Sequence, residues 1–280
     1  MRLATIERDD WVGIGVIEED EVADVAAVAP ELPRDLMALL ALEGGVEAVR
    51  EVAGRAPRLR LNDVRLLAPV LRPPKFLAIG LNYATHVEES GMQAPEHQLW
   101  FNKQSTCVVG PGAAIEVPEA STMVDYEGEL AFVIGRRCRR ISRDDAHSVI
   151  AGYTIVNDVS VRDWQFRTPT MTMGKSFDTH GPTGPWVVTP DEVGDPHKLR
   201  LRTWVNDELR QDGSTDDLIF DCFDMVEHLS TAFTLEPGDL ISTGTPAGVG
   251  VAMQPPRFLQ AGDTVRIEIE KIGVLENPVV

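Results

Sequence analysis

The stretch VDYEGELAFVIG, residues 124–135, places two carboxylates at the start of an otherwise apolar segment. In a strand, residues i and i+2 share a face, with Cα atoms ~6.6 Å apart, so Glu127 and Glu129 point the same way. The alternate side chains are expected to enter a core on the other face: Leu130, Phe132 and Ile134. Because burying a carboxylate is costly unless it is paired or holds a metal, the segment predicts either a solvent-facing acidic edge or a cation site.

A third oxygen donor is available at the end of another apolar run. Asp158 directly follows GYTIVN, residues 152–157. Mg²⁺ and Mn²⁺ take oxygen ligands, often a few carboxylates completed by water and substrate. An Asp at a strand end is also a common turn former, so the residues alone leave both interpretations open. A donor set of three carboxylates without a nearby His or Cys favours Mg²⁺ or Mn²⁺ over zinc.

Length, charge and cysteine content narrow the class of protein. A chain of 280 residues fits one large domain, or a main domain with a small companion. The net charge of −18 disfavours binding to nucleic acid or to an anionic membrane. Three scattered cysteines without a CxxC motif fit a reducing compartment. The N-terminus lacks a signal-peptide core, and no run approaches the ~18 apolar residues of a membrane helix, so we expect a cytoplasmic protein.

The first 70 residues predict a small unit of their own. RLATIE (2–7) and WVGIGVIE (11–18) are typical of two short strands. LPRDLMALLALEGG (32–45) has the apolar spacing of a helix, closed by Gly44. The prolines of LRPPKF then indicate a linker at 71–75.

Beyond residue 75, strand patterns dominate the chain. Two helices are expected, one at 142–152 with Ser142 as its N-cap and one within 221–238. The strand-like runs are FLAIGLN (76–82), ELAFVIG (129–135), GYTIVNDVS (152–160), GPWVVT (184–189), LRTWVN (201–206), DLISTG (239–244) and TVRIEIE (264–270). Many short strands with few helices predict a β-rich α+β domain, and not an alternating βα fold.

Several common catalytic motifs fail on spacing. GKS at 174–176 lacks the glycine that a phosphate loop needs five residues earlier, where Pro169 stands. The glycines of GTPAGVG (244–250) are wrongly spaced for a dinucleotide fingerprint, and the chain has neither HExxH nor GxSxG. Nucleotide-binding, zinc-protease and serine-hydrolase interpretations are therefore excluded.

Six segments in register resemble the fumarylacetoacetate hydrolase (FAH) family over roughly residues 70–280. They are GLNYATH (80–86), FNKQST (101–106), DYEGEL (125–130), NDVSVRD (157–163), GKSFDTHGPTGPW (174–186) and ISTGTPAGVG (241–250). The resemblance implies a catalytic domain of rolled, sandwich-like mixed β-sheets at 71–280, a small N-terminal α/β domain at 1–70, and a homodimer. It also implies that Glu127, Glu129 and Asp158 bind one divalent cation, Mg²⁺ or Mn²⁺.

The resemblance implies roles for further residues. His86 and Glu89 are three apart, a spacing that meets on one helical turn, and match the pair that hydrolytic members use as general base and orienter. Lys175 is implied to hold a substrate oxygen and stabilise developing negative charge. Without the resemblance, a loop-packing histidine and an exposed lysine are the simpler interpretations. The implied substrate contacts are Tyr83, Gln165, Thr245 and Arg167.

Two neighbouring features follow from the same resemblance. Arg162 is expected to be structural and to pair with Asp163. Residues 87–100 are expected to form a mobile lid over bound substrate, since Gly91 and Pro95 argue against one rigid helix there.

Family enzymes act on 2-oxo acids, so the leading prediction is a hydrolase that cleaves the C–C bond of a 2,4-dioxo acid, either an acylpyruvate or a diketo sugar acid. Its products are pyruvate or a related 2-oxo acid and a carboxylic acid. The alternatives are an oxaloacetate decarboxylase, an isomerase or hydratase of a 2-oxo or 2-hydroxydienoic acid, and a non-catalytic 2-oxo acid binding protein. The His86–Glu89 pair favours hydrolysis because it can activate water. The lid lacks Lys and Arg, which favours a neutral or hydroxylated tail, although Arg167 could contact a charged one.

Overall fold

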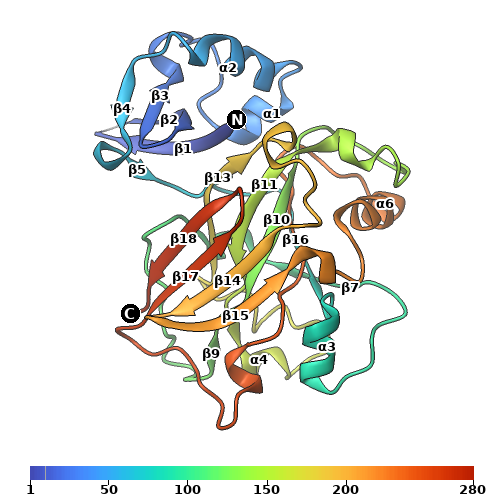
Figure 1. Cartoon of the computed structure of the whole chain (residues 1–280). Helices are drawn as coiled ribbons and strands as arrows, with labels where there is room; N and C mark the ends of the chain where they lie inside the picture. Colours follow the sequence, from blue (N-terminus) through green and yellow to red (C-terminus); the bar gives the residue numbers. More distant parts are fainter. Residues whose placement is uncertain (10) are drawn as a thin grey trace.

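Figure 1 shows the computed structural model, which describes residues 1–9 and 11–280. Its N-terminal unit contains β1 (Arg2–Arg8), β2 (Trp11–Glu18), β3 (Glu21–Asp24), α1 (Leu36–Ala41), α2 (Gly45–Ala53), β4 (Arg58–Arg60) and β5 (Arg65–Leu66). Asp35 caps α1 by accepting a hydrogen bond from the Ala38 N–H. The helix ends earlier than predicted, because Gly44 adopts a left-handed φ of 72° and precedes a second helix that the sequence pattern did not indicate.

A large mixed sheet runs through the whole molecule in the order β4-β3-β2-β1-β13-β11-β10-β16-β6-β7. Its remaining strands are β6 (Phe76–Gly80), β7 (Leu99–Lys103), β10 (Gly128–Ile134), β11 (Ile150–Asn157), β13 (Gly181–Val188) and β16 (Leu240–Ser242), with β5 paired to β1 and β8 (Val108–Val109) paired to β13. The N-terminal unit joins this sheet where β1 pairs with β13. The β-rich fold class is confirmed, and the division at residues 70 and 71 stays a prediction.

A second sheet packs against the central strands. It has the order β15-β14-β17-β18 and consists of β14 (Arg200–Val205), β15 (Glu208–Ser214), β17 (Thr264–Ile269) and β18 (Gly273–Pro278). Phe132 and Ile134 of β10 share one apolar core with Ile267 and Ile269 of β17. The strands β9 (Val124–Asp125) and β12 (Ser160–Val161) form a separate short antiparallel pair. This pair brings the DYE segment, residues 125–127, beside the residues that follow β11.

Beyond residue 75, the described chain also contains four α-helices: α3 (Ala84–Ser90), α4 (Arg162–Gln165), α5 (Pro190–Val193) and α6 (Cys222–Ala232). The predicted helix within 221–238 is α6, which starts with a capping box between Asp221 and Asp224. The helix expected at 142–152 is wrong: only a 3₁₀ turn forms at Ala146–Val149, and β11 begins at Ile150. Strand pairing with β10 and β13 determines the conformation there.

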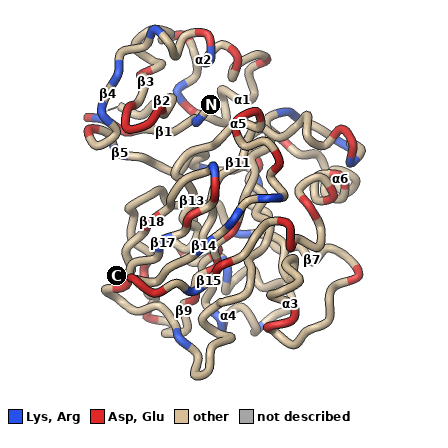
Figure 2. The backbone as a smooth tube through the Cα atoms, in the orientation of Figure 1, with Lys and Arg blue, Asp and Glu red and all other residues tan. Residues whose placement is uncertain are grey.

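Figure 2 shows acidic residues spread along the chain and not gathered in one segment. No helix within residues 1–9 and 11–280 has the length and hydropathy needed to span a bilayer.

Candidate active site

Glu127, Glu129 and Asp158 converge where the start of β10 meets the end of β11. Gly128 pairs with Asn157 in this antiparallel ladder, and the Asp158 N–H donates to the Glu127 carbonyl at 2.9 Å. The three side chains each offer an oxygen, and these oxygens lie within 4.8 Å of one another. All three residues are at most 5% exposed, so the alternative of a solvent-facing acidic edge is wrong. We refer to these three residues as the carboxylate cluster.

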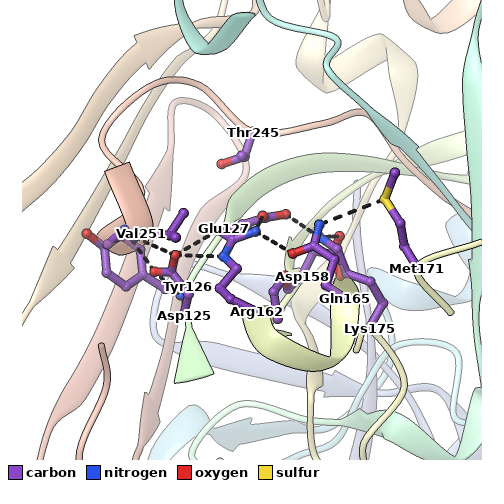
Figure 3. A network of polar contacts seen from close by, with 12 residues as sticks. Asp125, Tyr126, Glu127, Asp158, Arg162, Gln165, Met171, Lys175, Thr245 and Val251 are labelled. Carbon is purple, nitrogen blue, oxygen red and sulfur yellow. Dashed lines mark hydrogen bonds and ion pairs between the residues drawn. The ribbon is translucent and has the colours of Figure 1, made fainter. Parts of the chain in front are cut away.

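Buried cations balance two members of the carboxylate cluster (Figure 3). The Lys175 Nζ donates to Glu127 Oε2 at 2.6 Å and to Asp158 Oδ2 at 2.7 Å. Arg162 Nη1 donates to Glu127 Oε1 at 2.5 Å, and Lys103 Nζ donates to Asp158 Oδ1 at 2.7 Å. These contacts also correct the expected role of Arg162, whose guanidinium pairs with Asp125 and Glu127 and not with Asp163.

Glu129 is the member without a positive partner in the described part of the chain. Its Oε2 accepts hydrogen bonds from the Ser242 hydroxyl at 2.5 Å and from the Gly244 N–H at 2.9 Å. Its Oε1 accepts none from the described residues. Burial raises the pKa of Glu129 well above its usual range, and the charges of Asp158 and Glu127 raise it further.

The pKa values of Glu127 and Lys175 are set by their opposite charges more than by burial. Burial also raises the pKa of Glu127, but the charges of Lys175 and Arg162 outweigh this and hold that pKa below its usual range. Burial lowers the pKa of Lys175, while Asp158 and Glu127 raise it by more, so the ammonium stays charged. The site therefore combines a fixed cation with one carboxylate that lacks a counter-charge.

This donor set fits a hard divalent cation. Three carboxylates converge, and Glu129 also lines the cavity with one oxygen that accepts no hydrogen bond from the described residues. Carboxylate oxygens grouped in this way are the ligands that Mg²⁺ and Mn²⁺ prefer. The residues that would hold the ion are Glu127, Glu129 and Asp158.

His86 and Glu89 face each other on α3. The His86 Nδ1 lies 3.2 Å from Glu89 Oε2, and Glu89 Oε1 accepts a hydrogen bond from the Gly248 N–H at 2.8 Å. Because the contact with Glu89 uses Nδ1, the Nε2 of His86 is left for another partner. The side chains are 16% and 22% exposed, so this pair is more exposed than the carboxylate cluster.

A cavity of about 430 Å³ brings most of the predicted site together. Its polar lining consists of His86, Ser90, Glu127, Glu129, Arg162, Gln165, Arg167, Thr168, Lys175 and Thr245. Apolar side chains form much of the remaining wall, including Leu81, Met92, Leu99, Phe166, Met171 and Val251. Glu89 and Asp158 are not part of the lining, and they contact it through His86 and Lys175. A larger hollow of about 610 Å³ beside α6 has no carboxylate in its lining.

Three of the four predicted substrate contacts line the cavity, and Tyr83 does not. Gln165 Oε1 accepts a hydrogen bond from Arg162 at 2.9 Å, and Thr245 Oγ1 donates to the Gly128 carbonyl at 2.9 Å. Arg167 lies at the mouth with its guanidinium 3.9 Å from the centre of the Trp164 ring. Tyr83 is fully buried and is not part of the lining.

The predicted lid at 87–100 is only partly irregular. Its start belongs to α3, which ends at Gly91 with a φ of 66°, and its end belongs to β7. Between them, residues 92–98 form neither helix nor strand, and Met92 contributes to the cavity wall. Closure over substrate stays a prediction.

Sequence reasoning gave no role to Lys103 and Asp125. Lys103 is buried on β7 on the same face as Phe101, which is an i, i+2 pattern that could have revealed an inward lysine. Asp125 is buried and accepts from Arg162 Nε at 2.9 Å. No local pattern indicates that pairing, because the two residues are 37 positions apart.

Comparisons with known proteins agree with this geometry. Residues 75–280 match the family model described as Fumarylacetoacetate (FAA) hydrolase C-terminal. A mitochondrial oxaloacetate tautomerase of Xenopus laevis is 38% identical over 288 residues, covering 100% of this chain and 90% of that protein.

Two solved structures are similar over the whole chain. Maleylpyruvate hydrolase from Sphingobium sp. SYK-6, in complex with manganese(II) and pyruvate, has a TM-score of 0.81 at 34% identity, with 100% of this chain and 99% of that chain covered. The 5-carboxymethyl-2-hydroxymuconate delta-isomerase from Mycobacterium smegmatis has a TM-score of 0.81 at 40% identity, with 100% and 98% covered.

Proposed function

Because the chain belongs to the fumarylacetoacetate hydrolase family, we propose that it is a metal-dependent hydrolase that cleaves the C3–C4 bond of a 2,4-dioxo acid. The products are pyruvate, or a related 2-oxo acid, and a carboxylic acid. The observation that carries this proposal is the placement of His86. It lines the cavity that also contains Glu127 and Glu129, and Glu89 holds its Nδ1.

The polar groups that line the cavity divide the chemistry between them. A divalent cation held by the carboxylate cluster supplies a Lewis acid for the 2-oxo acid. Beside it, the charged Lys175 is placed to hold a substrate oxygen and stabilise negative charge as it develops. The largely apolar remainder of the wall fits a substrate tail without charge, as the absence of Lys and Arg from 87–100 also favours.

His86 serves as the base that activates water. Its Nε2 takes a proton from the water whose oxygen adds to C4, while Glu89 keeps the ring oriented. The C3–C4 bond then breaks with its electron pair moving to C3, which takes up a proton to give the methyl group of pyruvate. One water is consumed, and its oxygen ends in the released carboxylic acid.

A second candidate is the tautomerisation of oxaloacetate, or an isomerisation of a related 2-oxo acid. The relative from Xenopus laevis carries the name oxaloacetate tautomerase, and the one from Mycobacterium smegmatis is named an isomerase. Such reactions move protons within one substrate and need no attacking water. They would use the carboxylate cluster and Lys175 while depending less on His86, and the same holds for a decarboxylation of oxaloacetate.

The test is pyruvate release by the purified protein with Mn²⁺ from a panel of acylpyruvates, beside keto–enol conversion and decarboxylation of oxaloacetate, with EDTA as the metal-free control. We expect EDTA-sensitive hydrolysis that falls by roughly 10²- to 10⁴-fold in His86→Ala. His228→Ala, at an exposed position of α6, is the matched control and should retain activity. Turnover of oxaloacetate alone, unaffected by His86→Ala, would replace the hydrolase with the second candidate. Tight 2-oxo acid binding without any turnover would indicate a binding protein.

The remaining parts of the proposal concern metal, assembly and compartment. The ion is Mg²⁺ or Mn²⁺, a choice supported by the all-carboxylate donor set and by the manganese in the related hydrolase structure. A homodimer is proposed from the family resemblance. A cytoplasmic location is proposed from the sequence, although the relative from Xenopus laevis is named as mitochondrial.

A further inference from the structure

The glycine-rich turn at residues 248–251 contacts both the DYE segment and Glu89, the partner of His86. Asp125 Oδ1 accepts a hydrogen bond from the Gly250 N–H at 2.8 Å, and its Oδ2 accepts one from the Val251 N–H at 2.9 Å. The neighbouring Tyr126 donates its hydroxyl to the Gly248 carbonyl at 2.8 Å. Two consecutive residues of the DYE segment therefore fix the turn from one side (Figure 3).

The turn needs glycine at both of its anchored positions. Gly248 has a φ of +105°, and a Cβ there would lie 2.0 Å from the Arg210 carbonyl oxygen. A Cβ at Gly250 would lie 2.1 Å from the Arg257 carbonyl oxygen. The close backbone packing therefore explains why glycine occupies both positions of the GVG sequence, which fits no dinucleotide motif.

The other side of the turn holds the base. The Gly248 N–H donates to Glu89 Oε1 at 2.8 Å, and Glu89 Oε2 lies 3.2 Å from the His86 Nδ1. One peptide unit away, the Gly248 carbonyl is the group that Tyr126 fixes. A shift of this turn would therefore move the Glu89 carboxylate and rotate the imidazole.

The same segment also reaches the metal ligands. Arg162 donates through Nε to Asp125 at 2.9 Å and through Nη1 to Glu127 at 2.5 Å. Asp125 and Tyr126 are both fully buried, so solvent does not compete for these contacts.

We propose that Asp125 and Tyr126 are positioning residues for the His86–Glu89 pair, acting through the 248–251 turn. Asp125 and Tyr126 directly precede Glu127, the proposed metal ligand, and they fix the segment that holds the base. The catalytic meaning of this inference rests on the proposed hydrolase function, in which His86 activates water.

The test removes one hydroxyl, in Tyr126→Phe, and compares it with Tyr153→Phe. Tyr153 is also buried, and its hydroxyl makes no hydrogen bond with the residues that the structure describes. In Tyr126→Phe, kcat for the hydrolysed acylpyruvate should fall about fivefold, with KM and Mn²⁺ affinity within roughly twofold of the parent protein. In a protein that already carries Glu89→Gln, adding Tyr126→Phe should cause no further fall in kcat. Additive losses, or equal losses in Tyr153→Phe, would overturn the proposal.

Hydrogen exchange provides a readout that does not depend on turnover. Tyr126→Phe should accelerate amide exchange in both 246–252 and 84–91, whereas Tyr153→Phe should leave both segments unchanged. Glu89→Gln weakens the contact between Glu89 and the Gly248 N–H, so it should accelerate amide exchange in 246–252. If the parent protein hydrolyses no acylpyruvate, the proposed function is wrong, but the exchange data still test whether Tyr126 positions the His86–Glu89 pair. Unchanged amide exchange in 84–91 of Tyr126→Phe would refute that positioning role.

Discussion

The carboxylate cluster and the His86–Glu89 pair lie around one cavity but are held in different ways. The cluster sits at the meeting ends of two central strands, and no member is more than 5% exposed. The pair stands on a helix of seven residues that is followed by an irregular segment, and its side chains are 16% and 22% exposed. A site built on central strands holds its geometry tightly, whereas a short helix beside a loop can vary more freely.

This difference suggests how one scaffold supports several reactions. The relatives are named as a tautomerase, a hydrolase and an isomerase, and reactions of 2-oxo acids of these kinds share a need to stabilise negative charge. In the proposed function, the strand-borne cluster and Lys175 would meet that shared need. The helix-borne pair would activate the water that only hydrolysis requires. If the two regions act independently, substitutions in one should impair metal binding and substitutions in the other should impair only hydrolysis.

The largest effect is expected from the carboxylate cluster itself. Glu129→Gln replaces a proposed carboxylate ligand with a neutral amide, so a divalent cation should bind more weakly and turnover should fall by roughly 1000-fold. Isothermal titration with Mn²⁺ and an activity assay measure the two losses together. Glu119→Gln, at an exposed position, is the control and should bind Mn²⁺ normally. Normal Mn²⁺ affinity in Glu129→Gln would mean that the cluster is not the metal site.

The next effect concerns stability and not turnover. Lys175→Met leaves Glu127 and Asp158 without their shared buried cation, which should cost roughly 3–5 kcal/mol of unfolding free energy in metal-free protein. Added Mn²⁺ should restore part of this loss, because the ion replaces the missing positive charge. Urea denaturation with and without Mn²⁺ measures both. Lys198→Met, which removes a fully exposed lysine, should leave stability nearly unchanged, and an equally small change in Lys175→Met would contradict the prediction.

The helix-borne pair should respond more mildly and without loss of metal. Glu89→Gln weakens the charge-assisted contact with His86, so kcat for hydrolysis should fall roughly 10- to 100-fold. Mn²⁺ affinity and the unfolding transition should match those of the parent protein. Glu88→Gln, at the adjacent exposed position on α3, is the matched control. A loss of Mn²⁺ binding in Glu89→Gln would show that the two regions are not separable.

The same two regions differ in how far the sequence predicts them. Alternation along a strand predicts Glu127 and Glu129 on one face, whereas the residues alone left the role of Asp158 open and the family resemblance joined it to them. The counter-charges escape local rules, because Lys103 and Arg162 reach the cluster across 55 and 35 positions in the chain. The resemblance also led to the expected pairing of Arg162 with Asp163, but neighbours on a helix diverge.

Helix boundaries were predicted less well than strands. The helix that was expected to end at Gly44 stops at Ala41, and residues Gly45–Ala53 form another one. Around residue 146, a helical pattern gives way to β11, since the strand gains two partners in the central sheet. At the start of β11, tertiary packing outweighs local propensity, which differs by only about 0.7 kcal/mol per residue among ordinary amino acids.

The smallest effect is expected at the mouth of the cavity. The guanidinium of Arg167 stacks on Trp164 at 3.9 Å and pairs with Asp163 at 3.4 Å, so it already has partners outside the cavity. Arg167→Ala should therefore change kcat/KM by less than about threefold for an acylpyruvate with an apolar tail, within the range of exposed ion pairs. The informative comparison is a substrate whose tail carries a carboxylate. A selective loss of about tenfold or more for that substrate would show that Arg167 leaves Trp164 to bind it, and the preferred tail would then be acidic.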